Sequence, residues 1–309
     1  MHLAVNRAIN QIGQILLGKE HQVKLSMACL LARGHLLIED LPGMGKTTLA
    51  QCLSKTLGLA YDRVQFTSDL LPADILGVSV FDRNKADFSF KPGPIFTQVL
   101  LADEINRSPP KTQSALLEAM EEGQVSIDGA TRDLPSPFFV IATQNPQFQS
   151  GTFPLPESQL DRFLMCVSLG YPTEESELSL YRGVNPRVLL KKIEPVMGLE
   201  ELNAMQREVE AVQATDQVLA YLHRLVTTTR NDEKFSYGLS PRGALSWLRA
   251  AKAWALIHQR DYIVPDDIQI VLPAVVGHRV RAASSQVGQD ESILDYLLKH
   301  VDVLDRAVS

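Results

Sequence analysis

A short apolar segment, a glycine-rich loop and a helical segment follow one another between residues 35 and 57. The apolar segment His35–Glu39 predicts a strand, and Leu49–Leu57 predicts a helix. The loop between them reads Asp40-Leu41-Pro42-Gly43-Met44-Gly45-Lys46-Thr47-Thr48. Strand, loop and helix in this order direct backbone amides at the helix amino terminus toward a bound anion such as a phosphate. The segment therefore predicts an α/β unit that holds a phosphate group where the strand ends.

Individual loop residues have separate expected roles. Lys46 is expected to contact the β- and γ-phosphates of a nucleotide, and the hydroxyl of Thr47 to bind Mg²⁺. Gly43 and Gly45 let the backbone approach the phosphates without a Cβ atom in the way. The usual G-x-x-x-x-G-K-[ST] pattern has a glycine where this chain has Asp40. The alternative, a turn with an incidental Gly-Lys-Thr, remains open on the motif alone, but the flanking strand and helix favour a phosphate site. The residues expected to bind the nucleotide here are Pro42, Gly43, Met44, Gly45, Lys46, Thr47 and Thr48.

Apolar segments alternate with helix-like stretches from Gly34 to Leu169, a pattern typical of a parallel sheet covered on both faces. The segment from Val23 to Ala32 predicts a buried helix. Two stretches have apolar residues at every second position around a polar turn, which predicts β-hairpins. The hairpins are Val78–Phe90, around Arg83-Asn84-Lys85, and Gln124–Leu134, around Asp128-Gly129; the strands are His35–Glu39, Arg63–Phe66, Val99–Asp103, Phe138–Thr143 and Phe163–Leu169. The sequence therefore predicts an α/β domain with a five-stranded parallel sheet over residues 1–170.

Amphipathic helices replace the strands after Tyr171-Pro172. Pro241 and Pro265 suit the first position of a helix, since that position needs no N–H donor. The predicted helices are Glu201–Val212, Gln217–Thr229, Pro241–His258, Pro265–Val276 and Ser292–His300. They predict a small all-α domain over residues 171–309.

Length and composition support this organisation and exclude several classes of protein. The 309 residues are 45% hydrophobic and 21% charged, enough for two domains with a full core. A net charge of -6 gives no general attraction for nucleic acid. No apolar run approaches the ~20 residues that span a bilayer, and the amino terminus does not resemble a secretory signal, so we expect a cytoplasmic protein. The three Cys and seven His lack disulfide or zinc spacings, so the one metal expected arrives with the nucleotide.

Polar residues follow two of the predicted strands. Asp103 and Glu104 end the apolar run that begins at Val99, and Asn145 follows the next strand of the sheet. A carboxylate at such a strand end holds Mg²⁺ in nucleotide hydrolases, which suggests Asp103, and its neighbour Glu104 can orient the attacking water. Asn145 would face the same crevice and hold that water against the γ-phosphate. Solvated acids at a strand end and an Asn-Pro turn without catalytic role remain alternatives on these residues alone.

Longer segments carry a family resemblance. Residues 103–122, which read DEINRSPPKTQSALLEAMEE, closely resemble the MoxR family of AAA+ ATPases. Residues 143–146 (TQNP) and 155–163 (LPESQLDRF) resemble the same family, and the similarity covers nearly the whole chain. The resemblance implies a nucleotide domain that binds ATP and Mg²⁺, an α-helical lid, and assembly into a homo-oligomeric ring, usually a hexamer.

The resemblance also implies roles for single residues. Asn145 matches the sensor-1 residue, and Arg162 matches the arginine finger that one subunit supplies to its neighbour. Arg242, in the first turn of a predicted helix, matches the sensor-2 arginine of the lid, where it would contact an anion and link the lid to the nucleotide state. Arg107 is a rival for the arginine finger because it lies just beyond the carboxylate pair. Leu17-Gly18 is expected beside the adenine base.

Members of the family are typically chaperone-like ATPases that mature or activate partner proteins, often ones with a von Willebrand factor A domain or enzymes with metal cofactors. The sequence therefore predicts an ATP-hydrolysing motor that remodels, matures or activates a client protein. Insertion of a metal cofactor is one form that this activity can take. Phe81, Phe88 and Phe90 on the first hairpin are candidates for contacting the client, although they could also pack beneath the hairpin.

Three alternative functions remain. A DNA-directed AAA+ motor is one, because such relatives share the two inserted hairpins, although the acidic balance of the chain disfavours it. A subunit resembling the magnesium-chelatase motor is another. The third is a nucleotide-switched binding module that barely hydrolyses ATP, but such a switch would need neither Glu104 nor Asn145.

Overall fold

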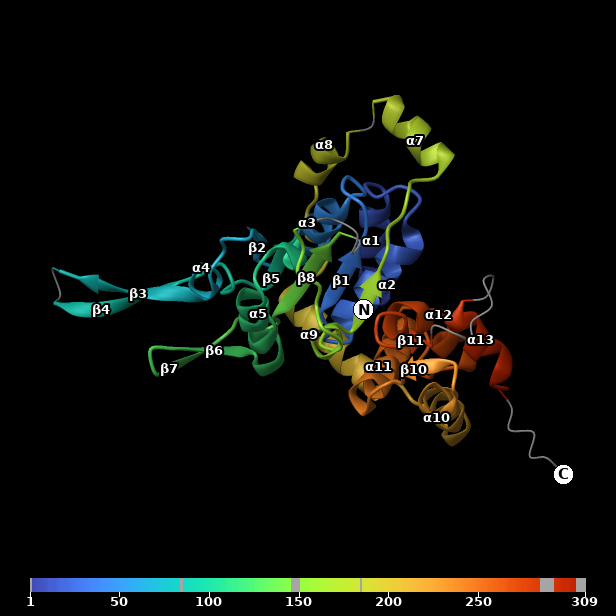
Figure 1. Cartoon of the computed structure of the whole chain (residues 1–309). Helices are drawn as coiled ribbons and strands as arrows, with labels where there is room; N and C mark the ends of the chain where they lie inside the picture. The colour runs from blue at the N-terminus through green and yellow to red at the C-terminus, as the bar shows by residue number, and fades with distance from the viewer. Residues whose placement is uncertain (1, 84–85, 146–150, 184, 284–291, 304–309) are drawn as a thin grey trace.

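A five-stranded parallel sheet forms the centre of the chain. The computed structural model describes residues 2–83, 86–145, 151–183, 185–283 and 292–303 (Figure 1). The strand order is β2-β5-β8-β1-β9, and every neighbouring pair is parallel. The central strands β5 and β8 are buried along their whole length, as expected for strands covered on both faces. All five predicted strands are confirmed, as β1 (Leu36–Glu39), β2 (Tyr61–Gln65), β5 (Val99–Asp103), β8 (Phe139–Gln144) and β9 (Met165–Val167).

Helices cover the two faces of this sheet with separate apolar clusters. Successive residues of β1 point to opposite faces, so Leu36 and Ile38 join one cluster and Leu37 joins the other. The first cluster includes residues of α1 (His2–Gly13), α2 (Glu20–Leu31) and α3 (Lys46–Thr56). The second includes residues of α4 (Pro72–Leu76) and α5 (Pro110–Glu122). The short 3₁₀ helix η1 (Ile105–Arg107) lies between β5 and α5.

Both predicted hairpins are present and project from the same side of the sheet (Figure 1). The first consists of β3 (Gly77–Asp82) and β4 (Asp87–Pro92), and the second of β6 (Gln124–Ile127) and β7 (Ala130–Asp133). Residues 84 and 85 of the first predicted turn lie outside the described residues. Phe81 and Phe88 are 50% and 67% exposed and face each other edge to face, whereas Phe90 lies under the guanidinium of Arg132 from the second hairpin. Of the three candidate phenylalanines, two are therefore open to a partner and one packs between the hairpins.

The carboxyl-terminal region contains the five predicted helices and a small sheet that was not predicted. An antiparallel pair, β10 (Phe235–Tyr237) and β11 (Arg281–Ala282), adds a short two-stranded sheet to this helical region. These strands are too short to show an alternating pattern. The helices are α9 (Leu199–Ala211), α10 (Asp216–Asn231), α11 (Pro241–Ile257), α12 (Pro265–Val276) and α13 (Ile293–His300). Pro241 and Pro265 occupy the first helical turn as predicted.

Two further helices, α7 (Glu174–Tyr181) and α8 (Pro186–Lys191), lie between the sheet and α9 and were not predicted. The later helices share the apolar core of the sheet domain, because Trp247 of α11 and Leu202 of α9 belong to the same cluster as Met27 of α2. The side-chain amide of Gln206 also donates to the carbonyl of Leu30 at 3.0 Å. The core is therefore continuous across residue 170, and the domain boundary there remains a prediction. Within the described ranges no helix is long and apolar enough to cross a membrane.

Candidate nucleotide site

The loop between β1 and α3 has the backbone shape that its glycines predict. Gly43 and Gly45 have φ values of 88° and 95°, in the left-handed region that strains residues with a side chain. Gly45 directly precedes α3, so the first amides of that helix border the loop. A Cβ atom on Gly45 would also lie 3.3 Å from the side chain of Leu16. The backbone conformation of the loop therefore favours glycine at both positions.

Lys46 lies buried at the centre of the site. Its ammonium donates to the carbonyl oxygen of Asp40 at 2.6 Å and to Oδ1 of Asn145 at 3.2 Å. Burial lowers the pKa of Lys46, and the carboxylates of Asp40, Asp103 and Glu104 act in the opposite direction. A partly desolvated ammonium between the loop and the end of β8 is suited to a phosphate, since opposite charges attract more strongly out of water.

Asp103 ends β5 beside this lysine, where its carboxylate has two donors. Thr143 Oγ1 donates to Oδ1 at 2.6 Å, and the guanidinium of Arg63 donates to Oδ2 at 2.5 Å. The same Thr143 oxygen accepts the backbone N–H of Glu104 at 2.9 Å. Thr143 and Arg63 were missed by the sequence reasoning, although both lie on strands that it predicted. Position on a strand could have identified Thr143, because residues at the carboxyl ends of adjacent parallel strands meet at one edge of the sheet, whereas Arg63 lies in the middle of β2 and reaches Asp103 through its long side chain.

Glu104 occupies a strained backbone position next to Asp103. Its φ of 57° lies in the left-handed region, which costs roughly 1–3 kcal/mol for a residue other than glycine. Its carboxylate accepts from Asn145 Nδ2 at 3.2 Å, from Gln65 Nε2 at 2.9 Å and from the guanidinium of Arg107 at 2.9 Å. The structure thus brings together Lys46, Asp103, Glu104 and Asn145, all of which were predicted, and places Arg107 beside Glu104 of its own chain.

A cavity of about 200 Å³ lies next to the glycine-rich loop. Leu17 lines it together with loop residues that include Thr48, which places the predicted base-side segment beside the loop. Gly18 has a φ of 70°, and a Cβ atom there would lie 2.7 Å from Ser176 Oγ. Sequence reasoning missed the residues that come from the segment after β9, because it contained no motif. They are Pro172, Ser176 and Pro186.

Asp40, at the position of the missing glycine, binds the start of that segment. One carboxylate oxygen accepts the backbone N–H groups of Leu169 at 2.5 Å and Gly170 at 2.9 Å, and the hydroxyl of Ser168 at 3.3 Å. Lys19 donates to the carbonyl of Tyr171 at 2.5 Å in the same region. The side chain at position 40 therefore has a structural partner, the chain that leaves β9.

Arg162 and Arg242 lie together, away from this cluster. Both pair with Glu121, at 3.0 Å and 2.9 Å. A cavity of about 200 Å³ that they line also includes Gly34 and His35, which precede β1, whereas the glycine-rich loop follows β1. Within one chain, Arg242 therefore does not lie beside the loop, and its predicted contact with an anion stays a prediction. The reason for this position is that α11 packs against α2 and α12 instead of covering the loop.

Comparison with known proteins shows the family of this chain. Residues 35–165 match the ATPase family associated with various cellular activities (AAA), and residues 227–296 match the AAA lid domain. The uncharacterized protein YeaC of Bacillus subtilis is 46% identical over 280 residues, which cover 91% of this chain and 88% of that protein. Chaperone MoxR1 of Mycobacterium tuberculosis is 39% identical over 288 residues, 89% of this chain and 75% of that one. The chain belongs to the MoxR family of AAA+ ATPases.

The MoxR fold is also found in a solved structure. A protein of Cytophaga hutchinsonii that is named as an ATPase superposes with a TM-score of 0.86 at 34% identity, over 97% of this chain and 95% of that one. The α/β fold with its helical lid region and the ATPase activity predicted from the sequence are thereby confirmed. The lid match begins at residue 227, within α10, so α7, α8 and α9 lie between the two matched segments.

Proposed function

We propose that this MoxR-family ATPase forms a ring, hydrolyses ATP where neighbouring subunits meet, and uses the energy to remodel or activate a partner protein in the cytoplasm. One observation carries the proposal. The loop, the carboxylates and Asn145 lie at the carboxyl end of β1, whereas Arg162 and Arg242 lie at its amino end. Because the arginines lie at the opposite end of the strand from the loop, a second copy of the chain is needed to bring arginines to the phosphates. Repeated head-to-tail contacts between copies form a closed ring, and we expect a hexamer.

The residues present fit a Mg²⁺ ion that accompanies ATP. Mg²⁺ prefers oxygen ligands and usually keeps waters and substrate phosphates around one or two protein groups. The Thr47 hydroxyl and the Asp103 carboxylate are oxygen donors of this kind. Among the described residues no group of three His, Cys, Asp or Glu is placed to hold a metal. When bound, the ion would neutralise charge on the β- and γ-phosphates.

The chain's own residues would then divide the work of hydrolysis. Lys46 binds the phosphates from the loop. Glu104 orients the attacking water, and Asn145, which contacts both Lys46 and Glu104, holds these two groups in register with the γ-phosphate. The side chains of Thr143 and Gln65 position the carboxylates through hydrogen bonds.

The neighbouring subunit would supply the remaining positive charge. Arg162 is the better candidate for the arginine finger, because Arg107 pairs with Glu104 of its own chain's site, whereas Arg162 and its partner Glu121 line the separate cavity at the amino end of β1. Arg242 shares the carboxylate of Glu121 with Arg162, so we propose that both arginines act on the neighbour's nucleotide. An arginine supplied between subunits contributes about 10³–10⁵ in rate.

The exposed pair Phe81 and Phe88 is a suitable contact for a client, since exposed aromatic clusters mark binding surfaces. The relative named Chaperone MoxR1 supports a chaperone role for this chain as well. A client with a von Willebrand factor A domain, or an enzyme that receives a metal cofactor, stays part of the proposal.

Mixing two inactive variants tests the shared site. Lys46→Ala removes phosphate binding but keeps the arginines, and Arg162→Ala keeps the loop but removes the finger. If sites form between subunits, an equal mixture recovers ATP turnover to about a quarter of the wild-type rate, because random assembly pairs an intact loop with an intact arginine at that frequency. Wild-type turnover per subunit should also rise with protein concentration. An Arg162→Ala variant with wild-type turnover at all concentrations, or a mixture that stays inactive although both variants assemble, contradicts the proposal.

A further inference from the structure

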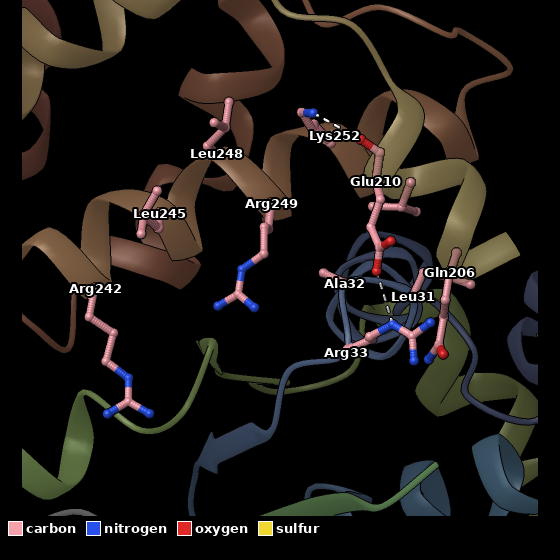
Figure 2. A pocket seen from close by; sticks show the side chains of 11 residues that line it. Leu31, Ala32, Arg33, Gln206, Glu210, Arg242, Leu245, Leu248, Arg249 and Lys252 are labelled. Carbon is pink, nitrogen blue, oxygen red and sulfur yellow. Dashed lines mark hydrogen bonds and ion pairs between the residues drawn. The ribbon is translucent and has the colours of Figure 1, made fainter. Parts of the chain in front are cut away.

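A groove of about 660 Å³ lies between the end of α2, the helix α9 and the helix α11 (Figure 2). Its size falls within the range of about 300–1,000 Å³ that is usual for binding pockets. Its walls are apolar and its rim is basic. The apolar residues are Leu31, Ala32, Val209, Leu245 and Leu248, and the basic ones are Arg33, Arg242, Arg249 and Lys252.

Two cations of this rim, Arg249 and Lys252, have no carboxylate partner among the described residues. Arg33 pairs with Glu210 at 3.2 Å, and Lys252 donates to the backbone carbonyl of Glu210. Arg249 donates only to Ser246 Oγ, at 3.4 Å, and in the described part of the chain no acidic side chain forms an ion pair with it. Its guanidinium points into the groove in Figure 2. Although this side chain is exposed, the protein atoms around it lower its pKa by desolvation. An incoming carboxylate would therefore find an uncompensated positive charge next to an apolar wall.

Helix α7 has the complementary character. Its first turn contains three glutamates, and it then exposes Leu178 and Tyr181, which are 42% and 77% exposed and lie on one side of the helix at a spacing of three. The glutamates are Glu174, Glu175 and Glu177. The exposed apolar side chains of α7 match the apolar wall of the groove, and its acidic first turn matches the basic rim.

The α7 helix of the same subunit cannot fill this groove. In Figure 1, α7 and α11 lie at opposite ends of the molecule, with the sheet domain between them. The α7 helix begins at the nucleotide cavity, because Pro172 and Ser176 line that cavity next to Gly43 and Thr48. The groove lies on the arginine side, since Arg242 lines both the groove and the cavity that contains Arg162.

These positions identify a partner. In the ring of the proposed function, on which this inference rests, the nucleotide end of one subunit faces the arginine side of the next. We propose that the groove receives α7 of the neighbouring copy, with an α7 glutamate beside Arg249 and with Leu178 and Tyr181 against the apolar wall. The contact is heterologous, so every subunit both offers an α7 and accepts one.

Cysteine cross-linking tests the geometry. Leu178→Cys places a thiol on α7, and Leu245→Cys places one on the exposed wall of the groove, in a chain whose partly exposed Cys166 is replaced by Ser. With Mg²⁺ and a non-hydrolysable ATP analogue, the chain with both substitutions should form a ladder of covalent oligomers under oxidation. A mixture of the two single variants should form covalent dimers only, and each single variant alone should form none. Rings that assemble without this cross-link, or single variants that cross-link to themselves, overturn the proposal.

Charge reversal tests the chemistry independently. Arg249→Glu should raise the protein concentration needed for half assembly at least tenfold in sedimentation velocity, and adding Glu175→Arg to the same chain should recover most of this loss. Arg207→Glu, on the exposed side of α9 outside the groove, is the matched control and should change assembly less than twofold. An unchanged assembly curve for Arg249→Glu overturns the docking of α7.

The two proposals can fail separately. A wild-type chain that never self-associates with nucleotide refutes the ring itself. A Leu245→Cys chain that assembles and passes the mixing test, while the introduced thiol stays open to maleimide within the ring, is a different result. That result refutes only the docking, and assigns the groove to a client segment or to a small ligand.

Discussion

Restoring the usual glycine of the phosphate loop, with Asp40→Gly, is predicted to destabilise this chain. Asp40 is 7% exposed, and one of its carboxylate oxygens accepts two backbone N–H groups and a hydroxyl at the point where the chain leaves β9. Hydrogen bonds to a charged group contribute about 1.5–3 kcal/mol each, and a buried N–H left without an acceptor costs about 1–3 kcal/mol. Gly also increases the entropy of the unfolded chain, by about 0.4–1 kcal/mol relative to a residue with a side chain.

The expected loss is therefore about 3–6 kcal/mol in the free energy of unfolding, since neighbouring bonds do not add fully. Urea denaturation followed by circular dichroism measures it. Asp40→Asn keeps one acceptor oxygen and should lose about half as much, whereas Asp69→Gly, on an exposed turn, should stay within about 0.5 kcal/mol of wild type. An Asp40→Gly variant as stable as wild type would refute the assigned role and would leave position 40 as an ordinary departure from the motif.

Two further predictions concern catalysis and pH. Glu104→Gln should keep nucleotide binding but lower the turnover number about 10²–10⁴-fold, as single-turnover assays would show; an unchanged rate would remove Glu104 from the role of orienting water. The free energy of unfolding should fall as the pH falls from about 6.5 toward 4, by up to about 1.4 kcal/mol per pH unit. Burial lowers the pKa of His35 to about 4, so in this interval the unfolded chain binds a proton that the folded chain does not. Nδ1 of His35 accepts the N–H of Val140 at 3.0 Å, so only the neutral ring fits, and His35→Gln should reduce the slope of the unfolding free energy over that pH interval.

The sequence predicted the candidate site residues whose chemistry suits one role and whose positions follow from the strands. Lys46, Asp103 and Asn145 follow buried strands, and the carboxyl ends of adjacent parallel strands meet, so their convergence could be predicted without coordinates. The two hairpins could also be predicted from the sequence, because the alternation of apolar residues and the turn between them are local signals.

Long-range packing could not be predicted in the same way. The lid arginine Arg242 lies opposite the loop because of how α11 packs on α2, and no local pattern encodes that docking. The predicted strand Phe163–Leu169 is shortened at its end because the N–H of Leu169 donates to Asp40 and not to a neighbouring strand. Helix α7 was missed because its acidic first turn breaks the apolar period.

The position of α7 has a thermodynamic consequence if the proposed ring contact is correct. Ser176 lines the nucleotide cavity and also lies in the helix that the neighbour's groove would hold. A nucleotide that shifts this turn changes the docking of α7, and linkage then requires that docking changes nucleotide affinity by the same factor. A Leu245→Glu chain that assembles at high concentration should therefore bind ATP with a different affinity from wild type, although Leu245 lines the groove and not the cavity that contains Arg162. Equal affinities in the two assembled rings would show that α7 docks without sensing the nucleotide.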